Sequence, residues 1–181
     1  NNSSDQFQQT FYVAEHALLE AEKRLIENMM GPAISSTERN EDIRGIPTNR
    51  ENADSGLDQT TACYKSFRNL SRDADFRVYE HIKEVSFYDV IEPILANTTG
   101  LGNTKEIENE IKNLRKYHYE FFTVNAGSST YKNAGSSLKK GSGTGQRTGS
   151  AYRIYGCGIM GNNAKKPEIL IPLETIAIIS H

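Results

Sequence analysis

The first thirty residues restrict the possible folds more than any other stretch of the chain. Within them, apolar side chains recur at alternating steps of four and three residues, at Phe7, Phe11, Ala14, Leu18, Ala21, Leu25 and Met29. This spacing places them along one side of an α-helix, while polar and charged residues occupy the other sides. Gly31 followed by Pro32 ends the pattern. The sequence therefore predicts a long amphipathic helix over residues 1–30, whose stripe needs a covering surface and whose N-terminal end projects beyond a small domain.

Length and composition favour one domain with many loops. The chain has 181 residues, of which 36% are hydrophobic, and this is enough for one core rather than two. A net charge of −2 and a pI near 6.1 provide no field that would attract nucleic acid or an anionic membrane, so nucleic acid is not an expected partner. No apolar run is long enough to span a membrane. The chain starts at Asn1 rather than Met, and we expect it to be a processed product.

The two cysteines predict a single disulfide. An even count is compatible with a Cys63–Cys157 bridge formed in an oxidising compartment, with two buried free thiols as the alternative. The bridge would close a long loop and stabilise the fold by about 4 kcal/mol in the chain-entropy model.

Residues 31–115 are expected to be an irregular and partly helical connecting region. The polar stretch 34–60 shows no periodicity and is expected to be a solvated loop. Over 73–90, apolar residues recur every three positions at Phe76, Tyr79, Ile82 and Val85, which favours a short helix, with a strand as the alternative. Extended chain is predicted over 91–95. A short helix is predicted to begin near Thr104, with Ile107, Ile111 and Leu114 on one face.

Residues 116–181 are expected to form an antiparallel sheet. Aromatic and β-branched residues predict a strand over 116–124, a second around Tyr152 and Ile154, and a third from Ile169 to Ile178. Pro172 would place the last strand at an edge or a bulge. The basic segment 126–150, rich in Gly and Ser, is predicted to be a mobile hairpin loop. The fold class is thus α+β, with the sheet covering the apolar stripe of the long helix.

No pattern of residues predicts catalysis, a cofactor or a metal. The glycines of 141–149 lack the Gly-Lys-Ser/Thr of a phosphate loop and precede a strand, so a flexible loop is favoured over phosphate binding. His16, His81, His118 and His181 show no metal-ligand spacing. No base is marked for Cys157 as a nucleophile. We therefore expect a non-enzymatic protein.

The long helix carries the predicted subunit contact surface. Core packing is favoured for Leu18, Leu25 and Met29. Phe7 and Phe11 are predicted to contact a partner, because a short sheet cannot cover the whole helix. The predicted contact surface continues along the neighbouring helix face, and comprises Phe7, Phe11, Ala14 and Leu18.

Both ends of the chain resemble a known family. The run Ala14-Glu15, Ala17-Leu18 and Ala21-Glu22 is similar to the lower N-terminal helix of PilX-type minor pilins of bacterial type IV pili. Near the C-terminus, Tyr119-Glu120-Phe121-Phe122, Tyr152-Arg153-Ile154, Gly156 to Gly158 and an apolar last strand resemble the closing sheet of that family. The chain departs from the family pattern at Leu173-Glu174, where Leu-Gln is expected, and in its long segment 126–150.

The resemblance implies a type IV pilin-like fold and a non-enzymatic function. A minor pilin of this family takes part in initiating pilus assembly and sits at the pilus tip, together with other minor and major pilins and a large adhesin. Its leader is removed by a prepilin peptidase, and an apolar half-helix anchors it in the inner membrane, facing the periplasm, before it enters the extracellular pilus. Two alternatives are a minor pseudopilin of a type II secretion system and a free-standing secreted adhesin or glycan-binding module.

Overall fold

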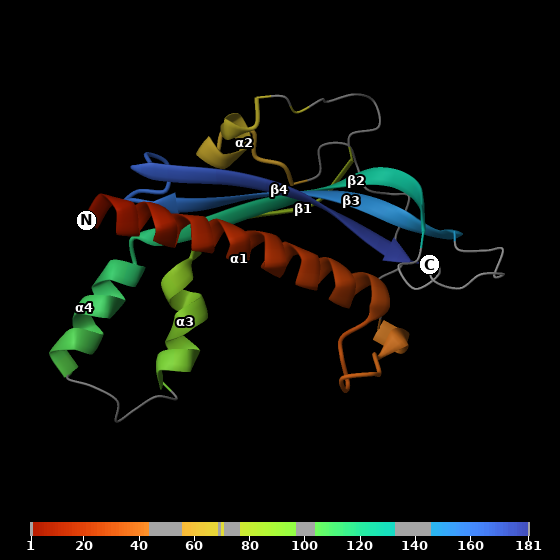
Figure 1. Cartoon of the computed structure of the whole chain (residues 1–181), viewed down its shortest axis with the longest axis horizontal. Helices are drawn as coiled ribbons and strands as arrows, with labels where there is room; N and C mark the ends of the chain where they lie inside the picture. The colour runs from red at the N-terminus through yellow and green to blue at the C-terminus, as the bar shows by residue number, and fades with distance from the viewer. Residues whose placement is uncertain are drawn as a thin grey trace.

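The computed structural model describes residues 2–43, 56–68, 70, 77–96, 104–132 and 146–180, and shows an α+β fold (Figure 1). The helices are α1 (Asn2–Met30), η1 (Glu41–Ile43), α2 (Ala62–Ser66), α3 (Phe87–Ala96) and α4 (Thr104–Leu114). The strands are β1 (Arg77–Ser86), β2 (Tyr117–Lys132), β3 (Gln146–Met160) and β4 (Ile169–Ser180). The predicted long helix and the predicted α+β class are confirmed.

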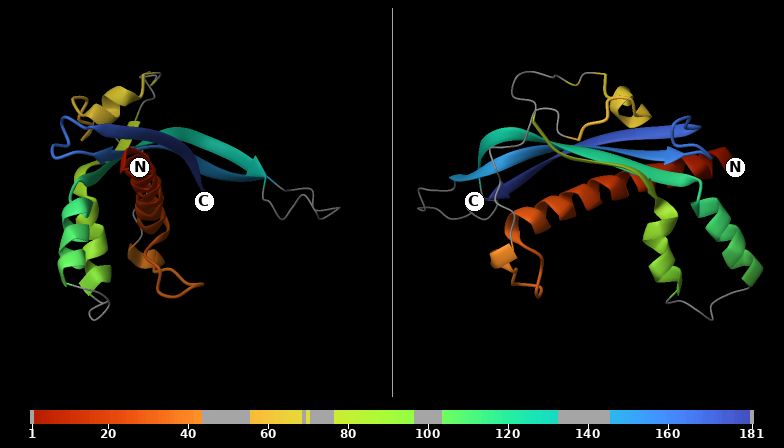
Figure 2. Two further views of the ribbon diagram at one scale, coloured as in Figure 1. Left: turned by 60° about the vertical axis from the view of Figure 1, so that its left-hand side comes forward. Right: turned by 180° about the vertical axis from the view of Figure 1, so that it is seen from behind.

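The four strands form one antiparallel sheet in the order β1-β2-β3-β4. Sequential strands are neighbours, as predicted for a meander. Pro172 lies in β4, and β4 is an edge strand, as its proline indicated. The sheet separates two layers, with α1 on one face and α2 on the other (Figures 1 and 2).

The main core lies between α1 and the sheet. The helix contributes Val13, Ala17, Ala21, Leu25 and Met29, and the strands contribute Phe121, Tyr152, Ile154, Ala177 and Ile179. Thr10 and Ala14 are also fully buried, whereas Phe7 and Phe11 are exposed. The sheet therefore covers the predicted stripe from Ala14 onward. The face that it buries is rotated about the helix axis relative to that stripe, so that it also includes Thr10, Val13 and Ala17. Only the residues before Thr10 extend beyond the core.

Small residues let α1 approach the backbone of β3. A Cβ atom added to Gly158 would lie 2.7 Å from the backbone nitrogen of Ala14 and would also clash with the carbonyl oxygen of Thr10. One added to Gly156 would lie 3.0 Å from a side-chain methyl of Leu18. Because glycine is the only residue without a Cβ, these two positions fix how closely the helix and sheet pack.

Over 77–86 the predicted helix is wrong and the alternative, a strand, is confirmed as β1, whereas residues 87–90 are helical and form the start of α3. Two register shifts in β1, between Val78 and Glu80 and between Ile82 and Val85, each add one residue to the strand. As a result Tyr79, Ile82 and Val85 all face α1 although they are three residues apart. A bulged strand thus produced the spacing that indicated a helix.

The extended chain predicted over 91–95 is also wrong, because α3 continues through Pro93. Phe87 and Val90 pack against the main core one helical turn apart, and this packing favours helix over extended chain. The short helix predicted near Thr104 is confirmed as α4. Together α3 and α4 project from the sheet on the side of α1 (Figure 2).

The predicted loop 126–150 is shorter than expected. Strands β2 and β3 remain paired from Ser128 opposite Ser150 to Lys132 opposite Gln146. Backbone hydrogen bonding does not depend on side-chain type, so the polar sequence of this segment does not end the ladder. Residues 133–145 lie outside the described residues.

Candidate functional site

The outward side of α1 carries large apolar side chains that the sheet leaves uncovered. Phe7, Phe11, Tyr12 and Leu19 are all exposed, and we call them the outer stripe. At 100° per residue Tyr12 and Leu19 lie on the side of the helix opposite the buried face, whereas Phe7 and Phe11 lie at the edge of that face, and Gln8 and Glu15 fall between the two pairs. The side-chain amide of Gln8 donates a hydrogen bond to the hydroxyl of Tyr12 (3.1 Å). The outer stripe is therefore a mostly apolar surface that also carries one carboxylate.

The structure separates the four predicted contact residues. Phe7 and Phe11 lie on the outer stripe, and Leu18 is half-buried against the main core. Ala14 is fully buried against the backbone of β3 at Gly158, so it is not available to a second protein in this fold. Tyr12 and Leu19 were not among the predicted contact residues, although their spacing of seven residues is itself a helical signal.

A second feature lies on the opposite face of the sheet, where a disulfide attaches α2 to β3. Cys63 and Cys157 are bonded and fully buried, with a Cα–Cα distance of 5.8 Å. The predicted disulfide is confirmed, and Cys157 is not a free nucleophile. Phe67 packs beside the bridge and also contacts the rings of Phe122 and Tyr155.

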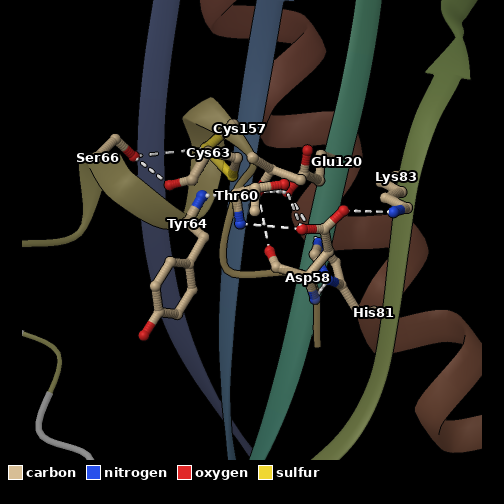
Figure 3. Close-up of polar contacts among 10 residues, drawn as sticks. Asp58, Thr60, Cys63, Tyr64, Ser66, His81, Lys83, Glu120 and Cys157 are labelled. Atoms are coloured by element: carbon tan, nitrogen blue, oxygen red, sulfur yellow. Dashed lines mark hydrogen bonds and ion pairs between the residues drawn. A yellow bond between two sulfur atoms is a disulfide. The ribbon is translucent and has the colours of Figure 1, made fainter. Parts of the chain in front are cut away.

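A buried polar cluster holds the segment before α2 on the same face (Figure 3). The backbone N–H of Asp58 donates to Nδ1 of His81 (3.0 Å), so the ring proton lies on Nε2. That nitrogen donates to Glu120 Oε2 (2.8 Å), which also accepts a hydrogen bond from the hydroxyl of Thr61 (2.7 Å). The same Thr61 hydroxyl accepts the backbone N–H of Tyr64 (3.1 Å) and so caps α2.

This cluster is arranged to hold a segment in place rather than to transfer protons to a substrate. Both ring nitrogens of His81 are engaged, and its side chain is fully buried. The hydroxyl of Thr61 donates to the carboxylate, and not to the histidine that would activate it as a nucleophile. Within the described ranges, no group of three or more His, Cys, Asp or Glu side chains could hold a metal ion.

Asp58 links the cluster to β1 at the surface. Its carboxylate accepts a hydrogen bond from the Lys83 ammonium (2.6 Å) and two from Thr60, one from its backbone N–H (2.9 Å) and one from its hydroxyl. Lys83 foremost, and then Thr60, hold the pKa of Asp58 well below its usual range. The same pairing with Asp58 raises the pKa of Lys83.

The depressed pKa of Asp58 predicts a loss of stability in acid. A carboxylate with a folded pKa below its unfolded value of about 3.9 stabilises the fold above that pH, and this stabilisation disappears as the pH falls toward the folded pKa. We expect the thermal midpoint of the wild type to fall more steeply below about pH 4 than that of Asp58→Asn, which cannot titrate at this position. If the thermal midpoints of the two proteins fell equally steeply as the pH is lowered below about 4, the result would contradict the low pKa assigned to Asp58.

Of the Gly-rich stretch 141–149, residues 141–145 lie outside the described residues, and residues 146–149 form the start of β3. Among the described residues, no helix is long and apolar enough to cross a membrane.

Comparison of the chain with protein-family models, with curated proteins and with solved structures finds no match.

Proposed function

We propose that the protein is a minor pilin subunit of a bacterial type IV pilus, which helps to initiate pilus assembly and sits at the pilus tip. The observation that carries the proposal is the division of α1 into two faces. One face is buried by the sheet, and the outer stripe of exposed apolar side chains runs from Phe7 and Phe11, at the edge of that face, to Tyr12 and Leu19 on the opposite side. A helix that is apolar on both sides is suited to pack simultaneously on its own sheet and on another helix.

The energetics of the outer stripe support a helix partner. Burying one such side chain contributes roughly 1.5–3 kcal/mol, so even partial coverage of all four would supply several kilocalories. Glu15 lies within this face, and a neighbouring helix could place a basic residue opposite it. Other minor and major pilins, which pack helix against helix, are the partners that fit this surface.

The disulfide supports a location outside the cytoplasm. Disulfides form and persist in oxidising compartments such as the bacterial periplasm. The Cys63–Cys157 bridge therefore fits a protein that faces the periplasm from the inner membrane and is later carried into an extracellular fibre. A large tip adhesin is a further partner under this proposal.

A minor pseudopilin of a type II secretion system is the second candidate, because a helix with two apolar faces would serve it in the same way. The two candidates differ in the process that fails when the outer stripe is altered. Pilus formation would fail in the first case, and export of folded proteins across the outer membrane in the second.

The test replaces outer-stripe residues in the full-length gene of the bacterium that encodes the protein. We expect Phe7→Glu combined with Leu19→Glu to reduce the number of surface pili about tenfold or more, because burying two carboxylates costs more than the 1.4 kcal/mol that corresponds to one factor of ten. Pili are counted by electron microscopy, and protein levels are compared by immunoblotting.

Matched controls separate the outer stripe from exposed apolar residues in general. Ile94 is as exposed as Phe7 (58% each), and Ile34 is as exposed as Leu19 (66% and 65%), but neither isoleucine lies on α1. The pair Ile94→Glu and Ile34→Glu should leave pili at wild-type numbers. Normal piliation by the α1 variants would overturn the proposal, and normal piliation with a defect in type II secretion would favour the pseudopilin.

A further inference from the structure

The two edges of the sheet differ in how well they are protected from pairing with another strand. The edge strand β1 has two register shifts, a positive φ of 58° at Glu84, and several charged residues including Lys83. Bulges and charges of this kind prevent an additional strand from binding. The edge strand β4 pairs with β3 without any shift over its twelve residues, and Glu174 is its only charged residue. The protein therefore protects one edge and leaves the other regular and apolar.

The hydrogen-bonding direction of β4 follows from its neighbours. Just after β3, the backbone N–H of Gly161 donates to the carbonyl of Lys116, just before β2 (2.9 Å). Because the direction alternates along a strand, the odd-numbered residues at the end of β3 also exchange hydrogen bonds with β2. Cys157 is one of these, and its partner Pro172 therefore lies at a position of β4 that faces away from β3. A proline is compatible with this position, because pairing with β3 does not require a backbone N–H from a residue that faces away from β3. The backbone N–H and C=O groups also point away from β3, to the open edge of the sheet, at Glu174, Ile176 and Ile178.

The side chains on this part of β4 leave room for a second strand. Ile176 and Ile178 are 59% and 41% exposed, while Ala177 and Ile179, on the other face, are buried under α1. Within the described part of the chain, no fifth strand pairs with β4. Two exposed isoleucines beside three outward backbone positions make a suitable site for strand addition.

We propose that β4 pairs antiparallel with β4 of a second copy of this chain, about a two-fold axis at Ile176. Ile176 then lies opposite its own counterpart, and Glu174 lies opposite Ile178 of the partner subunit. The single carboxylates do not face each other, so the pairing brings no like charges together. Pro172 falls at the end of the paired segment. Two four-stranded sheets become one continuous sheet, and the exposed isoleucines gain neighbours. The outer stripe is a separate surface, so this inference does not rest on the proposed function.

Sedimentation velocity over a range of concentrations tests the dimer. The wild type should show a reversible monomer–dimer equilibrium. Ile176→Pro should weaken it about tenfold or more, because the variant loses one outward N–H in each copy at a position where proline is compatible with the strand. Ile34→Lys is the control, since it changes a comparably exposed isoleucine elsewhere, and it should leave the equilibrium unchanged. A monomer at all concentrations, or equal weakening by both variants, overturns the proposal.

Cross-linking tests the register. Glu174→Cys and Ile178→Cys proteins should each remain uncross-linked when oxidised alone, because neither position faces itself across the axis. An equal mixture of the two should give a disulfide-linked dimer. Thermal midpoints close to that of the wild type show that both variants are folded. Cross-linking by either variant alone, or no cross-linking in the mixture, overturns the proposed pairing.

Discussion

Gly158→Ala is expected to lower the free energy of unfolding by about 3 kcal/mol, at the upper end of the range for overpacked sites. The added Cβ would meet backbone atoms of Thr10 and Ala14 on α1, including the Ala14 nitrogen at 2.7 Å. Backbone atoms of a helix cannot rotate away as a side chain does, so α1 itself must shift from β3. The change is measured by urea denaturation followed by circular dichroism.

Gly156→Ala provides the matched control on the same strand and the same face. Its added Cβ would meet side-chain atoms of Leu18 (3.0 Å) and Ala17 (3.3 Å) rather than backbone. Leu18 can change rotamer, so we expect a loss of about 1 kcal/mol. Equal losses for the two variants would show that α1 does not depend on backbone contact at Gly158.

Removing the disulfide is expected to have the largest effect on stability. The Cys63→Ala, Cys157→Ala double variant loses a bridge between residues 94 positions apart. The chain-entropy model assigns such a loop about 4 kcal/mol, because the unfolded chain gains conformational freedom. Urea denaturation should show a lower midpoint for the double variant.

Reduced wild-type protein is the reference for this variant. It should unfold at nearly the same urea concentration as the double variant, since both lack the bridge and keep the rest of the sequence. A loss below about 1 kcal/mol would show that the polar cluster and the packing of Phe67 already hold α2 without the bridge.

The sequence was sufficient to predict the elements whose side chains follow one uninterrupted period. The helix α1 and the strands around Tyr119, Ile154 and Ile171 have such a period, and their predicted types are confirmed. The stripe predicted for α1 is rotated toward Phe7 and Phe11, because it follows the large apolar residues, whereas the face that the sheet buries includes Thr10 and Ala17. Close packing against glycine favours small side chains, and the sequence of one helix does not reveal where glycines lie on its partner.

The errors arose where tertiary contacts override the local pattern. Two bulges gave β1 the three-residue spacing of a helix, and side chains at the first of them make hydrogen bonds and an ion pair with α1. Tyr79 accepts a hydrogen bond from Asn28 (2.8 Å), and Glu80 pairs with Arg24 (3.0 Å). These contacts join residues more than fifty positions apart, so no local window contains them.

The candidate site was predictable only in part. The sequence predicts a partner contact at Phe7 and Phe11, because these side chains are large and lie near the start of the helix, beyond the reach expected of a small sheet. The sequence did not predict contacts at Tyr12 and Leu19, because these two residues fall outside the apolar stripe that begins at Phe7. The bonds from His81 and Thr61 to Glu120 could not be foreseen, since three separate segments supply the groups.

The way α1 lies on the sheet also determines how the protein responds to mechanical force. The helix contacts β2, β3 and β4 along most of its length, from Thr10 to Met29 (Figure 1). A pull along the helix axis therefore loads these contacts at the same time, in shear, rather than peeling them apart one after another. Since the close contacts at Gly156 and Gly158 lie within this interface, sliding the helix requires its backbone to pass over the strand. The arrangement is suited to a subunit that must stay intact while its helix is under tension.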